Sequence, residues 1–239
     1  MFDLSIIIIN KNYLKYLKYS LDSCINQVTT FKYEIILIDD GSIDGSFEFA
    51  KKIENKKLKV FQTKGIGIEK ACNKGFKKSK AKYILRVDSD DYLHKNFINI
   101  MLTAIIKYKT AFVYSNYYLI RSNNKIIKKI RLPKFKKGEI LKRGDFLATG
   151  TIYNKDIIRK IGFYNESKKN SGLENYELIL KLISNKYCGK NINKFLFYYR
   201  KHDKNISYKK KNEILSFGKI IFENMKLGKY SRNKYHPWK

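Results

Sequence analysis

Short β-branched runs alternate with amphipathic segments through the first half of this chain, and this alternation limits the fold more than any other feature. Four runs have the length and residue types of buried strands, at 4–10, 33–40, 58–62 and 82–87. Three segments between them read as helices, at 13–27, 47–54 and 67–79. Strand and helix in succession predict right-handed crossovers and a mainly parallel central sheet flanked by helices. The expected fold class is therefore α/β.

The second half of the chain is less regular. Helices are predicted at 97–108, 155–164, 171–187 and 213–227, and strands at 110–120, 126–132 and 191–202, with a hairpin turn at 122–125. The two prolines mark no linker, so one continuous domain is expected over residues 1–208. It divides into a first half, 1–95, and a second half, 96–208. A basic C-terminal helix and tail follow at 209–239.

The charge of the chain points to a polyanionic neighbour. Lys and Arg number 51 against 21 Asp and Glu, a formal net charge of +30. An anionic membrane surface, a phospholipid-linked acceptor and nucleic acid all fit such an excess. The plain alternative is a lysine-rich surface that serves only solubility. Hydrophobic residues make up 44% of the chain, enough for a folded core, so a disordered polycation is excluded.

The cysteines and the apolar runs indicate in which cellular compartment the protein is found. Cys24, Cys72 and Cys188 are scattered and form no CxxC pair, so neither a zinc site nor a disulfide framework is expected. No apolar run approaches the roughly 18 residues of a membrane-spanning helix. The N-terminus lacks the basic start and long apolar region of a signal peptide. A cytoplasmic protein is expected, with peripheral contact at the inner face of the cell membrane as an option.

Three carboxylates, Asp88, Asp90 and Asp91, follow the strand at 82–87 in the sequence VDSDDYL. Crowded like charges cost free energy unless a cation or a reacting proton uses them. The D-x-D spacing is one that holds a divalent cation through hard oxygen ligands beside a substrate phosphate. The alternative is a polar turn in which Asp91 caps a helix beginning in YLHKNF.

A second acidic turn follows the strand at 33–40, in the sequence IDDGSIDGS. Asp39 and Asp40 end this strand, and the glycines after them permit a tight backbone turn. In parallel sheets ligands bind at the carboxyl ends of the strands, so both acidic turns should face one binding crevice. A buried carboxylate here can accept the imide N–H of a uracil ring. Asp44 is expected only to cap the next helix.

A glycine pair precedes the helix at 67–79, in TKGIGIEKACNKGF. Glycines before a helix allow a phosphate to approach its N-terminus, although a plain loop is the simpler interpretation. The full dinucleotide-binding fingerprint is missing, which argues against a Rossmann dehydrogenase.

Taken in order, these segments resemble the family 2 glycosyltransferases of the GT-A fold over roughly residues 4–205. The resemblance rests on five stretches: SIIIINKNYLKYLKYSLDS, EIILIDDGSIDGS, GIGIEKACNKGFKKSKAKYILRVDSDDYL, ENYELILKLI and YYRKHDKNIS. It implies a GT-A fold with a nucleotide-sugar-binding half at 1–95 and a less regular acceptor half at 96–208. It also implies a metal-dependent, inverting transfer from a nucleoside diphosphate sugar.

The resemblance assigns roles to individual positions in the nucleotide half. Ile9 and Lys11 would line the base of the nucleotide, Asp40 would bind uracil, and Asp39 would support the turn. Asp88 would reach ribose or a bound water.

Further roles fall at the reacting centre. Asp90 would bind Mn²⁺ or Mg²⁺ bridging the diphosphate, and Asp91 would face the donor sugar or the acceptor. His202 matches a position that can complete the metal or diphosphate site, although a solvated loop histidine would look the same.

Two departures from the family pattern stand out. The family's helix has Arg before Asn, whereas this chain has Cys72 before Asn73, so Lys70 or Lys74 would have to supply a cation. The family commonly has Glu-Asp where this chain has Glu174-Asn175, and its Asp acts as catalytic base.

An amide cannot accept a proton at neutral pH, so the base needs another assignment. Our hypothesis is that Glu174 is the base and that Asn175 orients hydroxyl groups. Alternatively Glu174 only forms a capping box with Ser171, and Glu177, one helical turn on, is a reserve candidate.

The expected function is transfer of a sugar, with UDP-sugar as donor, to a glycan or lipid-linked acceptor in surface polysaccharide synthesis. UDP and dTDP cannot be separated by Asp40, because both bases carry the imide N–H. One alternative is a catalytically impaired GT-A-fold protein that binds a sugar nucleotide. A basic nucleic-acid-binding protein is a further alternative, but no helix-turn-helix, RNA-recognition motif or zinc-finger spacing supports it.

Overall fold

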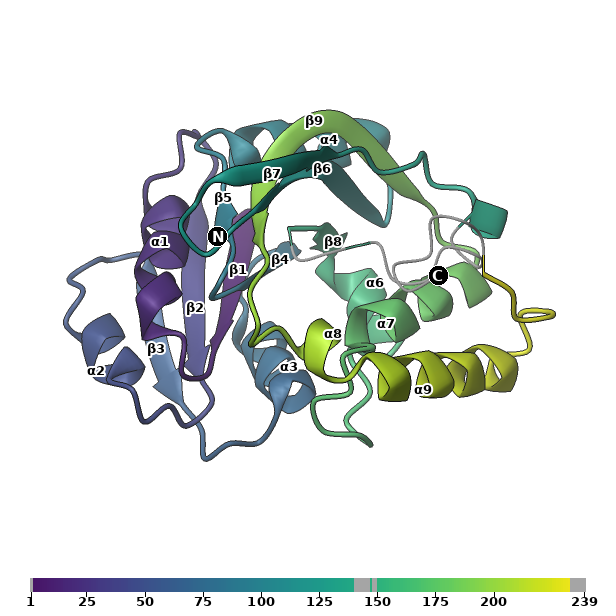
Figure 1. The fold of residues 1–239 in the computed structure, drawn as a ribbon. Helices are drawn as coiled ribbons and strands as arrows, with labels where there is room; N and C mark the ends of the chain where they lie inside the picture. Colours follow the sequence, from purple (N-terminus) through teal and green to yellow (C-terminus); the bar gives the residue numbers. More distant parts are fainter. Residues whose placement is uncertain (1, 140–146, 148–149, 233–239) are drawn as a thin grey trace.

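The computed structural model describes residues 2–139, 147 and 150–232. Its strands form a nine-stranded sheet in the order β3-β2-β1-β4-β8-β6-β9-β5, with β7 paired to β6 (Figure 1). The strands are β1 (Leu4–Asn10), β2 (Tyr33–Asp39), β3 (Leu58–Gln62), β4 (Tyr83–Asp88), β5 (Tyr92–Leu93), β6 (Phe112–Ile120), β7 (Ile126–Ile130), β8 (Ile152–Asn154) and β9 (Gly189–Arg200).

Helices cover both faces of this sheet (Figure 1). They are α1 (Leu14–Ile25), α2 (Ser46–Lys51), α3 (Ile68–Lys78), α4 (Phe97–Tyr108), α6 (Lys155–Lys160), α7 (Glu174–Ser184), α8 (Ile206–Lys209) and α9 (Lys211–Asn224). The α/β class expected from the sequence is confirmed, and the predicted helices and strands of the first half are all present within a few residues of their expected ends.

The apolar run of β1 supplies both cores. Ile6 and Ile8 point to one face of the sheet, where they pack with residues of α1 and α4. Ile7 and Ile9 point to the other face and pack with residues of α3 and α7. Successive side chains of a strand alternate between faces, so a strand buried on both sides reads as an unbroken apolar run. Each such side chain contributes about 1.5–3 kcal/mol when it is buried.

The first four strands are parallel, and their register sets the position of the acidic turns. β1 pairs with β2 so that Asn10 lies opposite Asp39, and with β4 so that Ile9 lies opposite Asp88. The carboxyl ends of these three strands therefore meet at one edge of the sheet.

The second half mixes directions. β8 joins β4 to β6 by antiparallel pairing on both sides, β9 runs parallel to β6, and β5 is antiparallel to β9. The predicted hairpin at 122–125 connects β6 to β7. β5, β8 and α8 were not predicted, because segments of two to four residues carry no readable periodicity.

The C-terminal helix α9 packs on the domain rather than standing apart from it. Ile214, Ile221 and Phe222 of α9 bury their side chains against Leu173 and Leu180 around α7. Among the helices of the described residues, none is both long and apolar enough to cross a membrane.

Candidate active site

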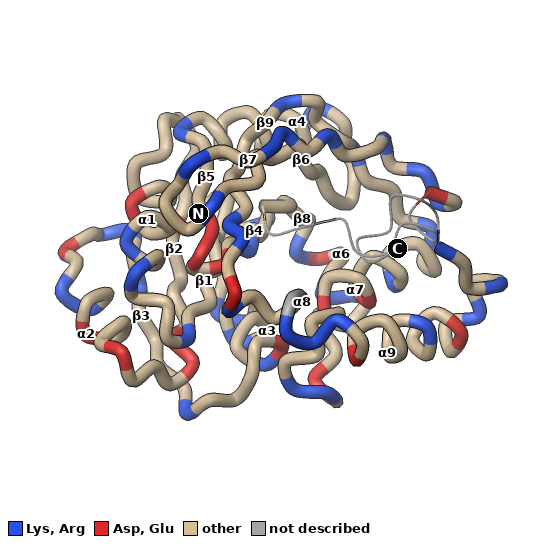
Figure 2. Tube along the Cα trace, viewed as in Figure 1, with Lys and Arg blue, Asp and Glu red and all other residues tan. Residues whose placement is uncertain are grey.

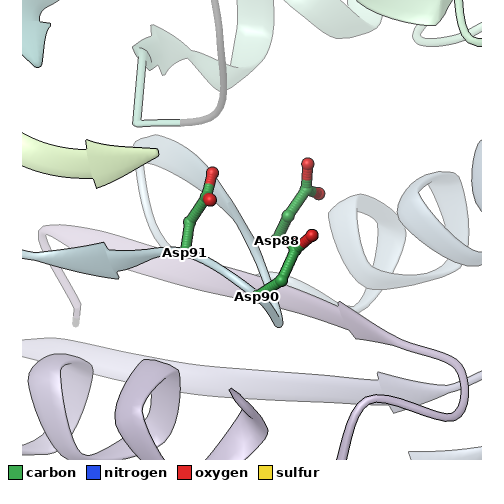
Figure 3. A group of neighbouring side chains, drawn as sticks. All are labelled: Asp88, Asp90 and Asp91. Atoms are coloured by element: carbon green, nitrogen blue, oxygen red, sulfur yellow. The ribbon is translucent and has the colours of Figure 1, made fainter. Parts of the chain in front are cut away.

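The three carboxylates of the loop after β4 lie together. Asp88, Asp90 and Asp91 each offer an oxygen atom, and these oxygens lie within 4.8 Å of one another. Figure 3 shows all three side chains on the same side of this loop. Asp88 and Asp90 are partly exposed, whereas Asp91 is buried. The sequence prediction of a carboxylate cluster at the end of a strand is therefore met by the geometry.

Partial removal from water makes ionisation of Asp88 costly. It raises the pKa of Asp88 to about 6; Arg86 opposes the rise, and Asp90 and Glu174 add to it. A bound cation would favour the charged forms of these groups. The donor set of hard carboxylate oxygens fits Mg²⁺ or Mn²⁺ in type.

Helix α1 holds the carboxylate loop through polar side chains. The hydroxyl of Ser20 donates to the carbonyl of Asp88 at 3.3 Å, and Ser23 Oγ accepts the N–H of Leu93 at 3.0 Å. Gln27 donates to the carbonyl of His94 and accepts the N–H of Ile98. These bonds fix the backbone from both sides of the loop.

Asp90 contacts the late histidine segment. Its Oδ2 lies 2.9 Å from Nε2 of His202 and accepts a longer bond from Asn205. Nδ1 of His202 accepts the backbone N–H of Lys204 at 3.1 Å, so the ring proton belongs on Nε2 and is donated to Asp90. The ring is stacked on Tyr16 at 5.2 Å. His202 therefore contacts the proposed metal ligand Asp90, and its expected part in completing the metal or diphosphate site stays a prediction.

Asp91 serves the backbone of β9. Its Oδ1 accepts the N–H of Arg200 at 2.8 Å, and Nε of the buried Arg200 donates to the carbonyl of Asp90. The residues that follow Asp91 form β5, and α4 begins only at Phe97 with Asn96 at its N-cap. The alternative in which Asp91 caps a helix is therefore wrong.

The turn after β2 is built on its two aspartates. Asp39 Oδ1 accepts the N–H of Ser42, and its Oδ2 accepts from the Asn10 side chain. Asp40 is 3% exposed. It accepts the backbone N–H groups of Ile66 and Gly67, and the hydroxyl of Thr63 at 2.6 Å. Asp40 thus joins the acidic turn to the glycine loop before α3.

Asp44 connects the starts of two helices. It accepts the N–H of Ser46 in α2 and, through its other oxygen, the N–H of Leu14 in α1. The helix-capping role expected for it extends to a second helix.

The buried guanidinium of Arg86 pairs with two carboxylates. It donates to Asp88 Oδ1 from Nε at 2.9 Å and from Nη2 at 2.8 Å, and to Glu174 Oε1 from Nη1 at 2.9 Å. Among the described residues, Oε2 of Glu174 has no hydrogen-bond partner.

The capping-box alternative for Glu174 is wrong. The N-cap of α7 is Leu173 and has no side-chain cap bond. Ser171 Oγ instead accepts the N–H of Leu173. Glu174 instead pairs with Arg86, because a buried guanidinium without a partner would be costly.

Asn175 is held by Tyr164. The tyrosine hydroxyl donates to Oδ1 of Asn175 at 2.6 Å, so Nδ2 is the free end of the amide. Tyr164 is itself fixed by Asn73, which bonds its backbone at both N–H and carbonyl. Burial raises the pKa of the Tyr164 hydroxyl, so it stays protonated as a donor.

Several other expected residues take definite places. Ile9 packs in the core on the α3 side, and Lys11 lies over Gly65, its Nζ 3.1 Å from where a Cβ of that residue would stand. Lys70 is exposed on α3. Glu177 accepts the amide of Asn165 and lies 3.8 Å from Lys181, with its side chain largely buried.

The sequence reading missed Arg86, Tyr164, Asn205 and Arg200. Arg86 carried a usable signal, because it stands two residues before Asp88 in an otherwise apolar strand and so shares its face. Asn205 stood in the quoted YYRKHDKNIS segment without a role. Nothing local marked Tyr164, whose partner lies on another element.

Comparison with known proteins gives one family and several relatives. The family model described as "Glycosyl transferase family 2" matches residues 5–162. An Escherichia coli protein named "UDP-Glc:alpha-D-GlcNAc-diphosphoundecaprenol beta-1,3-glucosyltransferase WfaP" is 28% identical over 221 residues, which is 91% of this chain and 84% of that protein. A cholesterol galactosyltransferase of Borreliella burgdorferi is 32% identical over 120 residues. That match covers 49% of this chain and only 33% of the relative's length.

Solved structures show the same fold. S. aureus TarS 1–349 in complex with UDP-GlcNAc superposes with a TM-score of 0.73 at 19% identity, over 92% of this chain and 66% of that one. The complex of TarS 1–349 with UDP gives a TM-score of 0.70 over 98% of this chain and 67% of that one.

Proposed function

The chain belongs to glycosyl transferase family 2, and on that premise we propose that it transfers a sugar from a UDP-sugar donor to a glycan or lipid-linked acceptor. The observation that carries the proposal is that two acidic turns lie at one edge of the sheet, at the ends of β2 and β4 on either side of β1. One holds the buried Asp40, and the other holds the cluster of Asp88, Asp90 and Asp91. Nucleotide and diphosphate would bind across these turns, at the carboxyl edge of the sheet.

The relatives support the choice of substrates. The printed name of the E. coli relative gives a UDP-glucose donor and a diphosphoundecaprenol-linked acceptor, and that of the Borreliella relative gives cholesterol as acceptor. Both acceptors are lipids. The similar TarS structures hold UDP-GlcNAc and UDP. Lipid-linked acceptors in surface polysaccharide synthesis are therefore the class we propose here.

Asp90 is the residue proposed to hold a divalent cation, with Asp88 beside it and His202 keeping Asp90 in place. When bound, Mn²⁺ or Mg²⁺ would stabilise the negative charge of a departing diphosphate. Asp40 Oδ2 accepts one N–H, from Gly67, and so can accept another from a uracil ring. Ile9 and Lys11 stand at the end of β1 beside this turn, where we propose that they line the base.

Glu174 is the proposed base for an inverting, single displacement. Arg86 binds one oxygen of its carboxylate, and the unpaired Oε2 remains to take the proton of an acceptor hydroxyl. The free amide nitrogen of Asn175 would donate to a hydroxyl oxygen of the donor or acceptor. Asp91 is anchored to β9 and would shape the sugar subsite through the loop backbone.

A second function is favoured by one observation. Asn175 cannot accept a proton, and it stands where the family pattern has its aspartate base. A chain that binds the sugar nucleotide without efficient transfer would keep Asp40, Asp88 and Asp90 and lose only this group. Replacement of Asn175 distinguishes the two functions, as argued in the Discussion.

The test of the proposed function is a calorimetric titration of UDP into the protein, with Mn²⁺ and with EDTA. Metal-dependent binding is expected, together with a loss of that dependence in Asp90→Asn. The matched control is Asp156→Asn, an exposed aspartate on α6 that pairs with Arg159. Absence of UDP binding in both conditions would move the proposal to other nucleotides.

The same proposal includes contact with an anionic membrane surface. Residues 92–138 contain nine lysines and two arginines and not one Asp or Glu. The exposed edge strand β7 lies in this stretch, and several lysines and arginines gather along it and its turn (blue in Figure 2). Ile126 and Ile127 are 55% and 45% exposed there, beside the exposed Lys128 and Lys129. Aliphatic side chains flanked by lysines suit the boundary of an anionic bilayer.

This surface is also tied to the site. Nη1 of Arg200 donates to the carbonyls of Arg121 and Ser122 at the hairpin turn, while its Nε donates to Asp90. If the β6–β7 hairpin binds the membrane surface, Arg200 would therefore hold the carboxylate loop at a fixed distance from that surface.

Vesicle sedimentation tests the membrane contact. We expect binding to vesicles with anionic lipid, weakened by salt and by Lys128→Glu with Lys129→Glu. The control makes the same charge changes at Lys51 and Lys52, two exposed lysines at the end of α2. Equal effects of both pairs would show a general charge effect and overturn the assignment to β7.

A further inference from the structure

A buried arginine interrupts the apolar strand that leads to the carboxylate cluster. Arg86 is 4% exposed, and the other residues of β4 before Asp88 are all buried and otherwise uncharged. Arginine is almost never fully buried unless it is paired, because removing its charge from water is costly. The pairing must therefore be what keeps it at this position.

The pairing joins two distant parts of the chain. Arg86 binds Asp88, two residues on, and Glu174, at the first position of α7 and 88 residues away. The ring of Tyr164 lies 5.7 Å from the guanidinium carbon. One rigid cation thus sets the spacing between the loop that would hold the diphosphate and the helix that carries Glu174 and Asn175.

Arg86 contacts only one of the two oxygens in each carboxylate. Both contacts to Asp88 are made at Oδ1, and the contact to Glu174 is made at Oε1. A planar guanidinium with fixed donors orients its partners as well as neutralising them. By holding Oδ1 of Asp88 and Oε1 of Glu174, the guanidinium also sets the positions of the second oxygens, Oδ2 and Oε2.

Position 72, on α3, lies on the same side of the sheet as this guanidinium, because Arg86 shares the strand face of Ile84, which packs in one core with Cys72. Cys72 is fully buried in the core between α3 and the sheet. Arg86 lies close enough to lower the pKa of the Cys72 thiol, although burial outweighs this effect and raises it overall. The family pattern has arginine at this position, so the helix and the strand offer two places from which one cation can reach the same point.

The alternative cations do not reach this place. Lys70 is exposed on α3, and Lys74 lies on the same helix two residues beyond Cys72 with a partly exposed side chain. Neither is among the partners that the structure gives Asp88 or Glu174. The expectation that a lysine of α3 supplies a cation stays a prediction, and Arg86 of β4 is the cation that contacts both carboxylates.

We propose that Arg86 is the positioning residue of this active site, and that it supplies from β4 the guanidinium that the family pattern places on α3 at position 72. The proposal deepens the proposed glycosyl transfer and rests on it for its functional arm. Its structural arm, the joining of Asp88 and Glu174 by Arg86, stands on the contacts alone.

The test moves the cation. Arg86→Leu removes it, Arg86→Lys keeps the charge without the fork, and Arg86→Leu with Cys72→Arg returns a guanidinium from the helix. Each variant is measured by circular dichroism, by thermal unfolding and by calorimetric titration of UDP with Mn²⁺. A second pair, Glu174→Gln alone and with Arg86→Leu, completes a double-mutant cycle on thermal unfolding.

The expected results follow from the geometry. Arg86→Leu should lower the unfolding temperature and weaken UDP binding by roughly tenfold or more, and Arg86→Lys should recover only part of each. The double variant with Cys72→Arg should return both to near the wild-type values. The cycle with Glu174→Gln should be non-additive, because the two residues are in contact.

Two results would overturn the proposal. One is a folded Arg86→Leu variant that binds UDP as the wild type does. The other is a double variant with Cys72→Arg that is no better than Arg86→Leu alone in either measurement. Failure of the wild type to bind UDP would count against the proposed function, while the unfolding cycle and the Cys72→Arg rescue would still decide the structural arm.

Discussion

The hydroxyl of Tyr164 donates a 2.6 Å hydrogen bond to Oδ1 of Asn175, at the start of the helix that carries Glu174. The pKa of Tyr164 is raised by burial, so the hydroxyl remains a donor through the neutral range. The amide nitrogen is consequently the end of Asn175 that is left for a substrate. This one bond makes position 175 a donor, where the family pattern has a proton acceptor.

Asn175→Asp tests what that difference means for catalysis. Aspartate can keep the bond from Tyr164 through one oxygen and offer the other as a base. If Glu174 already serves as base, turnover should change by less than about tenfold. Turnover is measured as release of UDP from a donor sugar with acceptor present. A rise of two orders of magnitude or more would identify the natural chain as the impaired binding protein.

Glu174→Gln tests the base directly. Glutamine keeps the shape and one contact to Arg86 but cannot take a proton, so kcat should fall by about 10²-fold or more while UDP affinity stays near that of the wild type. Glu177→Gln, one helical turn on in the same helix, is the comparison, since Glu177 is the reserve candidate for the base. Near-full turnover in Glu174→Gln would remove Glu174 from the reaction.

His202→Phe tests the support of Asp90. Phenylalanine keeps a ring to stack on Tyr16 but loses the 2.9 Å bond to Asp90. Affinity for Mn²⁺ in the presence of UDP should fall by about 10–100-fold, the usual loss when a residue that orients a ligand is removed. Complete loss of metal binding would instead assign His202 as a direct ligand, and an unchanged affinity would remove it from the site.

The first half of the fold could be read from the sequence because each strand is a continuous apolar run and the acids come directly after it. The parallel order of β1, β2 and β4 then brings Asp39, Asp40 and Asp88 to one edge without further information. The long helices and strands of the second half were predicted as well, but β5 and β8 were not, because they have only two and three residues. Their pairing depends on neighbours already in place, and no local pattern encodes it.

At the site, too, local patterns were predicted from the sequence and long-range contacts were not. The spacing of Ser171 and Glu174 predicts a capping box, and a solvent-exposed helix end would have formed one. Arg86, buried 88 residues earlier in the chain, takes the carboxylate instead. Contacts of this range follow from packing of whole elements, so a reading of local motifs finds the residues and misses their partners.

Acid stability should depend on Glu34, whose side chain is buried at the start of β2. Burial alone would raise its pKa, but hydrogen bonds from Lys59, the Lys80 backbone and Ser5 outweigh it and lower the pKa overall. Because the folded pKa lies below the unfolded value of about 4.3, the carboxylate stabilises the fold above that pH. The stabilisation is lost as the pH falls through the folded value.

Glu34→Gln should therefore be less stable than the wild type at neutral pH, and the gap should narrow as the pH falls below about 4. Urea unfolding followed at several pH values measures this. Glu48→Gln, an exposed position on α2, is the control. A gap that stays constant down to the lowest pH would mean that the shape of the side chain matters and its charge does not.

Gly41→Ala tests the contact between the acidic turn and the glycine loop. Gly41 has φ +75°, and a Cβ there would lie 3.0 Å from the backbone nitrogen of Gly65. Gly162 has a similar φ of +84° with open space around it, so Gly162→Ala measures the conformational cost alone, about 1–2 kcal/mol. Gly41→Ala should cost about 1–3 kcal/mol more, since backbone must shift to make room.

Gly41→Ala should also weaken UDP binding, because the loop beginning at Gly65 donates the N–H groups that hold Asp40. Equal losses of stability in the two variants, with UDP affinity unchanged, would show that the two loops move independently.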